Sequence, residues 1–434
     1  MLFIDEVVRK IWEDNSSSYQ TVFQAASGRE PQQLYEELKN IEISFFEGDM
    51  LNTSALVTSG CTHHVRDGFL SGCSMCDLHS EYQDIEAQLA ALKRKDPRLY
   101  VKVLRESFEN KRGIINRRSL KEYLLCHNFL DEEEIPQDLL PELFGANGVY
   151  KKRPMFYEFE TSVRSITPER LDILERYAGK NGIWFRLGLE CENEWLRNHW
   201  LNKNTSDAQI SEVVRLCKER GHKITGNVMI GLPGLTEEQS LNQYQKTIEW
   251  LTRLGIEMYS ISVMNRKELT LQGFMYRHLK TNKPLIDHKI VNGEHTGLPW
   301  LFTVVRALRW GLDNIPDFRT RLAYGQLASL YIPGRNYTVA YNGSPTCQCF
   351  ARIYEAFQNL VFHNDWGQIT ALQDWIQDDP CYREYLELIE LQENLSIADT
   401  IRITGMELAK MMWPSEWRDK LEKLDKELSN FTVT

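Results

Sequence analysis

The pattern of apolar and polar positions divides the chain into three parts. Residues 1–53 have a helical period, in which Val7 and Ile11 share one apolar stripe. From residue 54 to 265, short apolar runs alternate with longer amphipathic segments, which is typical of strands alternating with helices. Residues 266–434 are again mostly helical in pattern. We therefore expect a helical N-terminal extension (1–53), an α/β domain (54–265) and a mainly helical C-terminal domain (266–434).

The α/β part contains six predicted strands. They lie at 54–59, 99–104, 155–160, 183–188, 224–230 and 258–263. Segments with a helical period separate them, at 81–95, 118–129, from 167 onward, 206–220 and 236–254. Alternation of this kind implies right-handed crossovers and a parallel sheet. Six units are fewer than the eight of a closed barrel, so the fold class we expect is α/β, a partial (βα)6 TIM-like barrel.

Three cysteines follow the first predicted strand. Cys61, Cys73 and Cys76 are spaced C-x11-C-x2-C on one loop. Three thiolates on a loop can hold three corners of a [4Fe–4S] cluster and leave one iron open to another ligand. The alternative is a tetrahedral zinc site, which needs a fourth ligand, His63 or His64. The cysteines by themselves fit both sites.

Further polar residues stand where the other predicted strands end. They are Ser107, Glu160, Glu190, the loop Gly231–Gly234 and Asn265. In barrels and open α/β sheets, the carboxyl ends of the strands form the active-site edge. We therefore expect these residues to gather around the cysteine loop.

Composition and charge limit the function classes. The chain has 434 residues, of which 42% are hydrophobic and 26% charged, as in a water-soluble globular protein. No apolar run approaches the length of a membrane span, and the N-terminus lacks the features of a signal peptide. The nine cysteines do not suggest a disulfide framework. A net charge of −10 argues against a broad nucleic-acid surface. We expect a cytoplasmic protein without membrane contact.

Several motifs, in the same order along the chain, resemble the radical S-adenosylmethionine (SAM) superfamily. Gly72-Cys73-Ser74-Met75-Cys76 is similar to its Gly-Cys-x-Met-Cys, and Ser107-Phe108 to the end of its Gly-Ser-Phe. Gly188-Leu189-Glu190 resembles the start of Gly-Leu-Glu-Thr, and Gly231-Leu232-Pro233-Gly234 is its Gly-Leu-Pro-Gly. With Leu298-Pro299-Trp300 and Cys347-Gln348-Cys349, the similarity covers roughly residues 54–362. It is greatest to the branch of the Elongator catalytic subunit, above all the radical SAM subunit of archaeosine synthase and its relatives.

The resemblance implies an enzyme with a [4Fe–4S] cluster on Cys61, Cys73 and Cys76. SAM would chelate the open iron, and an electron donor such as flavodoxin or ferredoxin would reduce the cluster. A 5′-deoxyadenosyl radical released from SAM would then abstract a substrate hydrogen. The resemblance also implies a set of SAM contacts: Met75, Ser107, Glu160, Glu190, Arg197, Asn227, Gly231 and Asn265.

Each implied SAM contact also has a structural interpretation. Met75 can fill a gap beside the cluster, and Ser107 can stabilise a turn. A buried carboxylate at residue 160 or 190 needs a partner, for which Arg164 or Arg197 is available. Near the C-terminus, Cys347 and Cys349 are either a second metal site or free thiols.

Three departures from the family pattern bear on the substrate. The first cysteine gap is eleven residues instead of three, Glu106 replaces a glycine, and Cys191 replaces a threonine. With the acidic charge balance, these changes favour a small-molecule substrate of a biosynthetic pathway. The alternative is modification of a tRNA base, as in archaeosine synthase, with a partner protein. A further hypothesis, from a different functional class, is a non-catalytic interaction protein that binds an iron–sulfur cluster or zinc.

Overall fold

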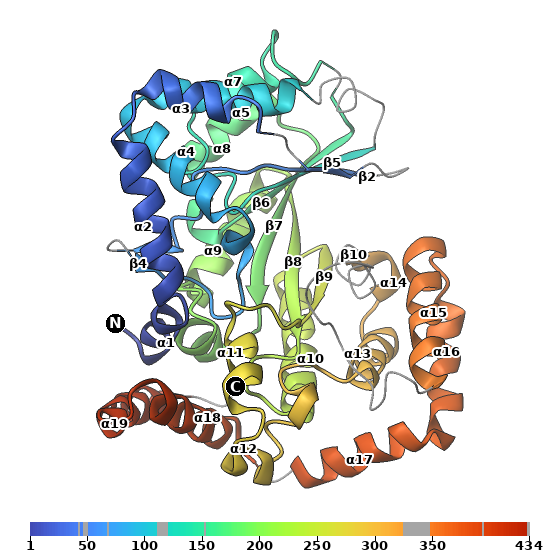
Figure 1. Cartoon of the computed structure of the whole chain (residues 1–434). Coiled ribbons are helices and arrows are strands. Elements are labelled where there is room, and N and C mark those ends of the chain that lie inside the picture. Colours follow the sequence, from blue (N-terminus) through green and yellow to red (C-terminus); the bar gives the residue numbers. More distant parts are fainter. Residues whose placement is uncertain are drawn as a thin grey trace.

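The chain forms a curved, mainly parallel sheet with helices on its outer face and at both ends (Figure 1). The computed structural model describes residues 1–41, 44–46, 51–66, 69–110, 120–151, 153–323, 348–392 and 395–431. Cys347 of the predicted C-x-C pair lies outside these ranges. Within them, no helix is both long and apolar enough to cross a membrane.

The sheet has the strand order β1-β2-β5-β6-β7-β8-β9-β10. Its strands are β1 (Ser44–Phe46), β2 (Leu51–Ala55), β5 (Lys121–Leu125), β6 (Phe156–Thr161), β7 (Ile183–Glu190), β8 (Lys223–Ile230), β9 (Met258–Val263) and β10 (Leu322–Ala323). Only β1 pairs antiparallel with its neighbour. From β2 onward, strand order follows chain order, so the sheet curls into a half-barrel. The expected α/β partial barrel is confirmed.

Helices connect successive strands. They are α4 (Gln83–Lys95) and α5 (Pro97–Glu109) after β2, α7 (Leu139–Phe144) after β5, α8 (Pro168–Ala178) after β6, α9 (Asp207–Glu219) after β7 and α10 (Glu237–Leu254) after β8; α11 (Leu271–Leu279), α12 (Lys283–Asp287), α13 (Leu301–Asn314) and α14 (Phe318–Arg321) lie between β9 and β10. Thr167, Ser206 and Thr236 cap the first turns of α8, α9 and α10 through their side chains. These caps confirm the predicted helix starts.

Two predicted elements are wrong. The predicted strand 99–104 lies inside helix α5, and the predicted helix 118–129 contains strand β5. Asp96 caps α5 by accepting from two backbone amides, Pro97 occupies its first turn, and its buried positions recur at helical spacing. Strand β5 lies between β2 and β6 and is buried on both faces at its centre, so its sequence shows no alternation.

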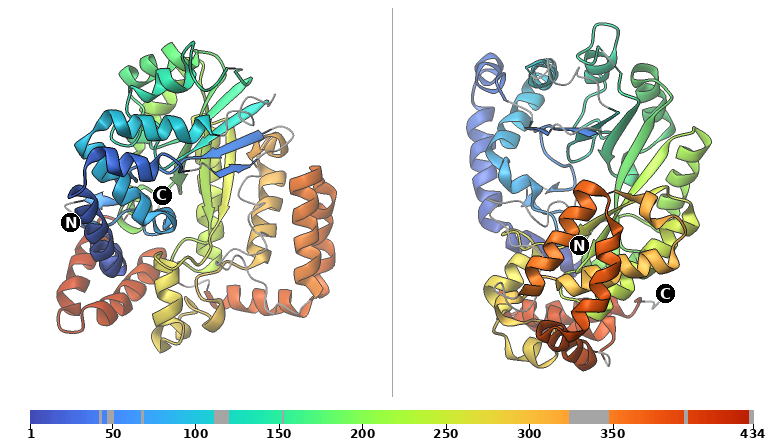
Figure 2. Two further views of the ribbon diagram at one scale, coloured as in Figure 1. Left: turned by 45° about the horizontal axis from the view of Figure 1, so that its top comes forward. Right: turned by 90° about the vertical axis from the view of Figure 1, so that its right-hand side faces the viewer.

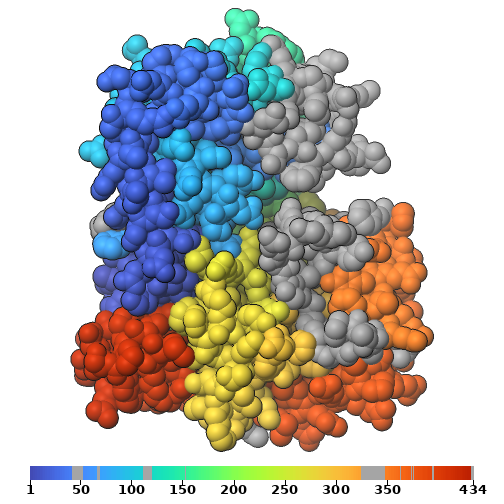
Figure 3. Space-filling view, viewed as in Figure 1, coloured from blue at the N-terminus to red at the C-terminus, as the bar shows by residue number. Residues whose placement is uncertain are grey.

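The two ends of the chain pack against each other. The N-terminal helices are α1 (Phe3–Ile11), α2 (Glu13–Ser27) and α3 (Pro31–Leu38), and the C-terminal ones are α15 (Gln348–His363), α16 (Trp366–Trp375), α17 (Pro380–Gln392), α18 (Ile397–Met412) and α19 (Trp417–Leu428). Glu6 of α1 pairs with Lys420 (2.7 Å) and Lys423 (2.6 Å) of α19. The space-filling view shows the blue N-terminal and the red C-terminal segments as neighbours (Figure 3). Figure 2 shows the molecule from two other sides.

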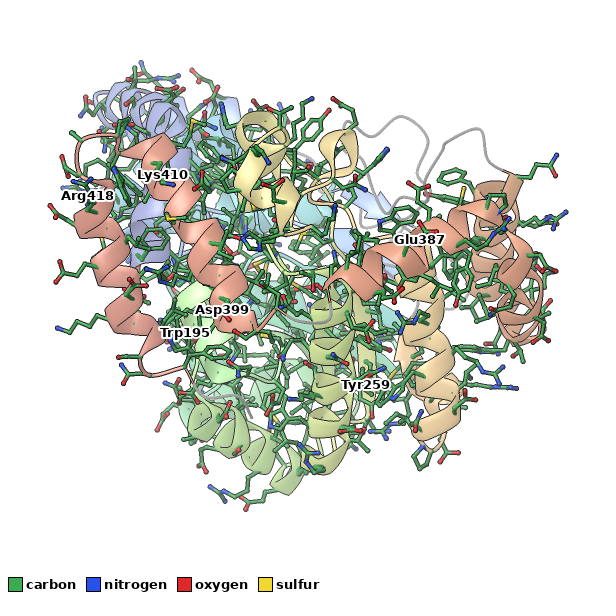
Figure 4. The ribbon with its side chains drawn as sticks, turned by 90° about the horizontal axis from the view of Figure 1, so that it is seen from below. Trp195, Tyr259, Glu387, Asp399, Lys410 and Arg418 are labelled. Atoms are coloured by element: carbon green, nitrogen blue, oxygen red, sulfur yellow. The ribbon has the colours of Figure 1, made fainter. Side chains whose placement is uncertain are left out.

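Two hydrophobic cores result. One lies between the sheet and its outer helices and includes Phe159, Leu187 and Tyr244. The other joins α1, α11, α18 and α19 to loops at the carboxyl ends of the strands, including Leu232 and Met264. Seen from below, α18 and α19 cover this edge, where the Trp195 indole N–H donates to the backbone oxygen of Glu427 (2.9 Å) (Figure 4).

Candidate functional site

The cysteine loop leaves the carboxyl end of β2 and forms a small hairpin. Its strands β3 (Val65–Arg66) and β4 (Phe69–Leu70) pair within the eleven-residue gap. The backbone N–H of Ser71 donates to the oxygen of His64 (2.6 Å), so the insertion folds back on itself. It thereby returns the chain to Cys73 close to where it left Cys61. The long gap is thus compatible with three thiols at one place.

The thiols of Cys61, Cys73 and Cys76 affect one another's ionisation. Burial raises the pKa of the Cys76 thiol to about 12, and the neighbouring Cys73 adds to the shift. Burial likewise raises the pKa of Cys61, with smaller contributions from Glu134, Cys73 and Cys76. Three clustered thiols in a low-dielectric environment need a cation to become thiolates. An iron–sulfur cluster or another metal centre held by these thiols would supply that charge.

The segment that follows β7 holds the loop in place. The hydroxyl of Ser74 donates to the backbone oxygen of Trp200 (2.8 Å). The side-chain amide of Asn202 donates to the backbone oxygen of Gly72 (2.7 Å). One ring nitrogen of His63 lies 2.6 Å from the oxygen of Asn202, and the other lies 3.4 Å from the guanidinium of Arg164. Both nitrogens of His63 are thus engaged, which does not fit a fourth zinc ligand.

Two glycines let the loop pass close to a group of histidines. Gly72 has φ +117°, and a Cβ there would lie 2.1 Å from the ring of His64. Gly60 has φ +89°, and a Cβ there would lie 3.0 Å from a carboxylate oxygen of Glu86. Each glycine precedes a cysteine of the loop, so a side chain at either position would displace Cys61 or Cys73.

The concave face of the half-barrel carries a buried network of charges. Glu158 accepts two hydrogen bonds from the guanidinium of Arg186 (3.2 Å each) and one from the hydroxyl of Thr225 (2.8 Å). The ammonium group of Lys121 lies 2.7 Å from the same carboxylate. Arg186 also donates to Ser260 (3.2 Å). This network forms a polar floor beneath the strand ends.

Glu160 and Glu190 lie above this floor. Burial raises the pKa of Glu160 to about 7; Arg186 opposes the shift, and Glu190 adds to it. Glu190 has φ +65° and pairs with Lys203 (3.1 Å), which the sequence did not single out. Burial opposes the charge on Lys203, but Glu190, Cys73 and Cys76 together raise the pKa of Lys203. Lys203 is therefore held protonated against Glu190, within electrostatic range of Cys73 and Cys76.

Two of the implied SAM contacts occupy structural positions. Ser107 is buried on α5, where its hydroxyl donates to the oxygen of Val103 (3.0 Å), because the strand expected before it is a helix. Arg197 is fully buried in the π-helical turn η3 (Leu196–Trp200). Its guanidinium donates to the backbone oxygens of Cys191 (2.8 Å), Glu192 (3.0 Å) and Thr205 (3.0 Å), and contacts Asp207. The polar groups of both side chains therefore form hydrogen bonds within the protein.

The other implied contacts lie at strand ends or in the loop. Asn227 is on β8 with its side-chain amide 3.5 Å from Glu160, and its buried oxygen has no hydrogen-bond partner among the described residues. Gly231 directly follows β8, has φ +87° and lies against Pro299. Asn265 follows β9, and Met75 packs at the edge of the second core. The structure thus brings these residues to the same edge as the cysteines.

A polar cavity of about 570 Å³ opens beside the loop. It is lined from the cysteine loop and from the ends of β5 and β6, by Thr62, His63, Asn128, Leu130, Asp131, Glu132, Ser162, Arg164, Ser165, Thr167, Arg170 and Asn204. Its volume is that of a small-molecule site.

Two compact groups of potential metal ligands occur among the described residues. In each, the ligand atoms all lie within 4.8 Å of one another: His79, Glu86 and His127, and Cys349, Asp379 and Cys381. The three loop cysteines do not form so compact a group. A tetrahedral zinc ion holds its sulfurs about 4 Å apart. The three thiols of the loop therefore do not match the ligand spacing around a single zinc ion.

Sequence reasoning missed Lys203, His79 and His127. His127 lies two residues after strand β5, which was assigned to a helix, so its place at a strand end was hidden. His79 comes three residues after Cys76, and that proximity to the cysteine motif was the available signal. Near the C-terminus, the structure groups Cys349 with Cys381 and Asp379, and Cys381 stands outside the predicted C-x-C pair.

Comparison with known proteins gives limited matches. No family model matches the chain. An uncharacterized protein of Methanocaldococcus jannaschii is 30% identical over 128 residues, which are 29% of this chain and 38% of that protein. This chain thus spans well under half of that relative's length.

Solved structures with some likeness are of radical SAM enzymes. The methyltransferase TsrM from Kitasatospora setae has 16% identity and a TM-score of 0.35, over 54% of this chain and 40% of that one. Coproporphyrinogen III oxidase (HemN) from Escherichia coli has 15% identity and a TM-score of 0.32, over 57% of this chain and 48% of that one. The cobalamin-dependent enzyme OxsB has 11% identity and a TM-score of 0.29, over 88% and 59%. All three TM-scores lie below 0.5.

Proposed function

We propose that this protein is a radical SAM enzyme. The observation that carries the proposal is the three-cysteine loop at the carboxyl edge of a parallel half-barrel, with the polar residues Glu160 and Asn227 on strands of the same sheet. Cys61, Cys73 and Cys76 would hold a [4Fe–4S] cluster as thiolates. When bound and reduced, the cluster would supply the electron that cleaves SAM to methionine and a 5′-deoxyadenosyl radical.

The protein's own residues would position SAM and exclude water. Glu160, with a pKa of about 7, is able to accept or donate a hydrogen bond near neutral pH. The buried oxygen of Asn227 is ready to accept a hydrogen bond, for example from the adenine or amino group of SAM. Glu190, Gly231, Asn265 and Met75 would complete the contacts. Ser107 and Arg197 are left out because their polar groups serve the fold.

We further propose a small-molecule substrate that occupies the 570 Å³ cavity. The cavity borders the cysteine loop through Thr62 and His63, so a bound molecule would lie next to the site of radical formation. Arg164 and Arg170 in its wall favour a substrate with an anionic or strongly polar group.

Anaerobic reconstitution tests the enzyme class. The reconstituted chain should show an iron–sulfur absorption band near ~400 nm and release 5′-deoxyadenosine from SAM when dithionite replaces the biological electron donor. Cys73→Ala should lose both signals. Cys217→Ala, at a buried cysteine on α9, should keep them. Stoichiometric zinc on the loop without SAM cleavage would contradict the proposal.

The tRNA alternative has its own test. A tRNA substrate would give gel shifts whose strength falls steeply with salt. We expect no shift at physiological ionic strength, and a specific shift would move the assignment to tRNA modification.

A further inference from the structure

A buried group of two histidines and one carboxylate lies behind the cysteine loop. His79 belongs to the short helix η1 (Leu78–Glu81), Glu86 to α4, and His127 follows β5. One carboxylate oxygen of Glu86 contacts Nδ1 of His79, and the other lies 2.8 Å from Nε2 of His127. The three ligand atoms all lie within 4.8 Å of one another. His127, which lies 41 residues after Glu86, thus meets two residues from the adjacent elements η1 and α4.

The surroundings of this group isolate it from water. His79 and Glu86 are 0% and 1% exposed. The rings of Trp12 and Tyr19 lie 6.0 Å and 5.4 Å from that of His79. Nε2 of His79 has no hydrogen-bond partner among the described residues. A buried polar group without a partner is costly, so the group calls for a ligand.

The charge of Glu86 points to the kind of ligand. Among the described residues, no lysine or arginine pairs with its carboxylate, which contacts the two imidazoles. A carboxylate buried without a cation is strongly destabilising, and a metal ion is a cation small enough to enter between these side chains. Metal–nitrogen and metal–oxygen bonds of about 2.0–2.2 Å place neighbouring ligand atoms about 3.3 Å apart, within the observed spread.

We propose that His79, Glu86 and His127 bind one divalent first-row transition-metal ion, such as Zn²⁺ or Fe²⁺. Two imidazoles and a carboxylate are a ligand set typical of both ions, and they leave coordination positions open. The ring of His64 lies 5.6 Å from that of His79 and 5.8 Å from that of His127, so it stands beside the open side of the group. This site is separate from the cysteine loop and independent of the radical SAM proposal.

The position of the site indicates what it does. Gly60, which precedes Cys61, packs on Glu86 and His79, and His79 follows Cys76 by three residues. The ion would therefore fix both ends of the cysteine loop to α4 and β5. We infer a positioning role for the ion, in which it orders the loop that carries the three thiols.

Metal titration of a full-length chain without the cysteine donors tests the proposal. Cys61, Cys73, Cys76 and Cys381 are changed to serine, so that neither the loop nor the Cys349 group contributes. After treatment with a chelator, this parent chain is titrated with Zn²⁺ and with Co²⁺ as a coloured substitute. We expect saturable binding of about one ion per chain and a rise in melting temperature on binding.

Glu86→Gln in the parent keeps the shape and hydrogen bonding of the side chain but removes its charge. We expect the amount of bound ion to fall to about a tenth or less, because one ligand of the ion is lost. His288→Gln, at an exposed histidine, should bind like the parent. His127→Gln gives a second reading if Glu86→Gln does not fold, and circular dichroism of the metal-free chains reports folding. The proposal is overturned if the parent binds no ion or if Glu86→Gln and His127→Gln bind as much as the parent.

Discussion

Replacing Glu158 by glutamine tests whether the polar floor of the half-barrel is a stabilising network. The carboxylate is fully buried and meets Arg186 at two distances of 3.2 Å, Lys121 at 2.7 Å and Thr225 at 2.8 Å. Glu158→Gln retains the shape of the side chain but leaves two cations facing a neutral amide. The substitution therefore removes one partner of a buried ion pair while the others stay in place.

The expected cost follows from the burial of the two cations. Removing one partner of a buried pair costs about 3–5 kcal/mol. The side chain of Arg186 is 6% exposed, whereas that of Lys121 is 18% exposed and can reach water, so we expect about 3 kcal/mol. Urea unfolding of the metal-free chain measures it as a lower midpoint. Glu212→Gln is the matched control, because Glu212 pairs with Arg215 on the surface, where such pairs contribute about 0–1 kcal/mol.

The same pair gives a pH dependence with a defined sign. Burial by itself would raise the pKa of Glu158, but Arg186 and Lys121 outweigh it and hold the pKa below the usual 4.5. Because the folded pKa is below the unfolded one, the stabilisation is present above pH 4.5 and is lost as the pH falls through the folded value. The difference between wild type and Glu158→Gln should therefore shrink in acid. A cost below about 1 kcal/mol at neutral pH, or a control as destabilised as the variant, would refute the network.

Three further predictions concern the cysteine loop, helix α5 and Lys203. Gly72→Ala should abolish iron–sulfur incorporation on reconstitution, since its methyl group would meet a buried imidazole, whereas Gly221→Ala, with nothing within 4 Å, should incorporate normally. Leu104→Ala should lower the free energy of unfolding by about 2–5 kcal/mol and the exposed Arg98→Ala by less than about 0.5 kcal/mol, as urea titration would show. Lys203→Met should make the cluster's reduction potential more negative by tens of millivolts, on the order expected for one nearby charge, in a potentiometric titration; an unchanged potential would place Lys203 away from the cluster.

The sequence predicted the sheet well where strands alternate with capped helices. Strands β6 to β9 were recognised because each is an apolar run followed by a helix with a side-chain cap or a glycine stop. The region between β2 and β6 was misassigned because the local patterns of residues 99–104 and 118–129 favour the wrong kind of element. Residues 99–104 include β-branched and aromatic residues yet form a helix, since Asp96 and Pro97 start one and Tyr100, Leu104 and Phe108 share its buried face.

The candidate site was predictable only in part, for a related reason. The cysteines form a motif along the sequence, so their location on one loop was visible. Lys203 and Glu86 have no such motif, because Lys203 pairs with Glu190, 13 residues earlier, and Glu86 pairs with His127, 41 residues later, as well as with His79. The backbone partners of Arg197 were equally invisible in the sequence, where only side chains such as Glu190 were available as partners. Charged residues acquire their roles from tertiary contacts, which a pattern along the chain does not contain.

The eleven-residue gap and the N-terminal helices form one structural unit. The hydroxyl of Ser71 donates to Asp5 of α1 (2.6 Å), and the backbone N–H of Leu70 donates to Ser16 of α2 (2.9 Å). The hairpin of the gap is therefore fastened to the first two helices. Because α1 is in turn paired with α19, the order of the cysteine loop depends on both ends of the chain. A three-residue gap would reach no such partners, so the longer gap is what couples the cysteine loop to the terminal helices.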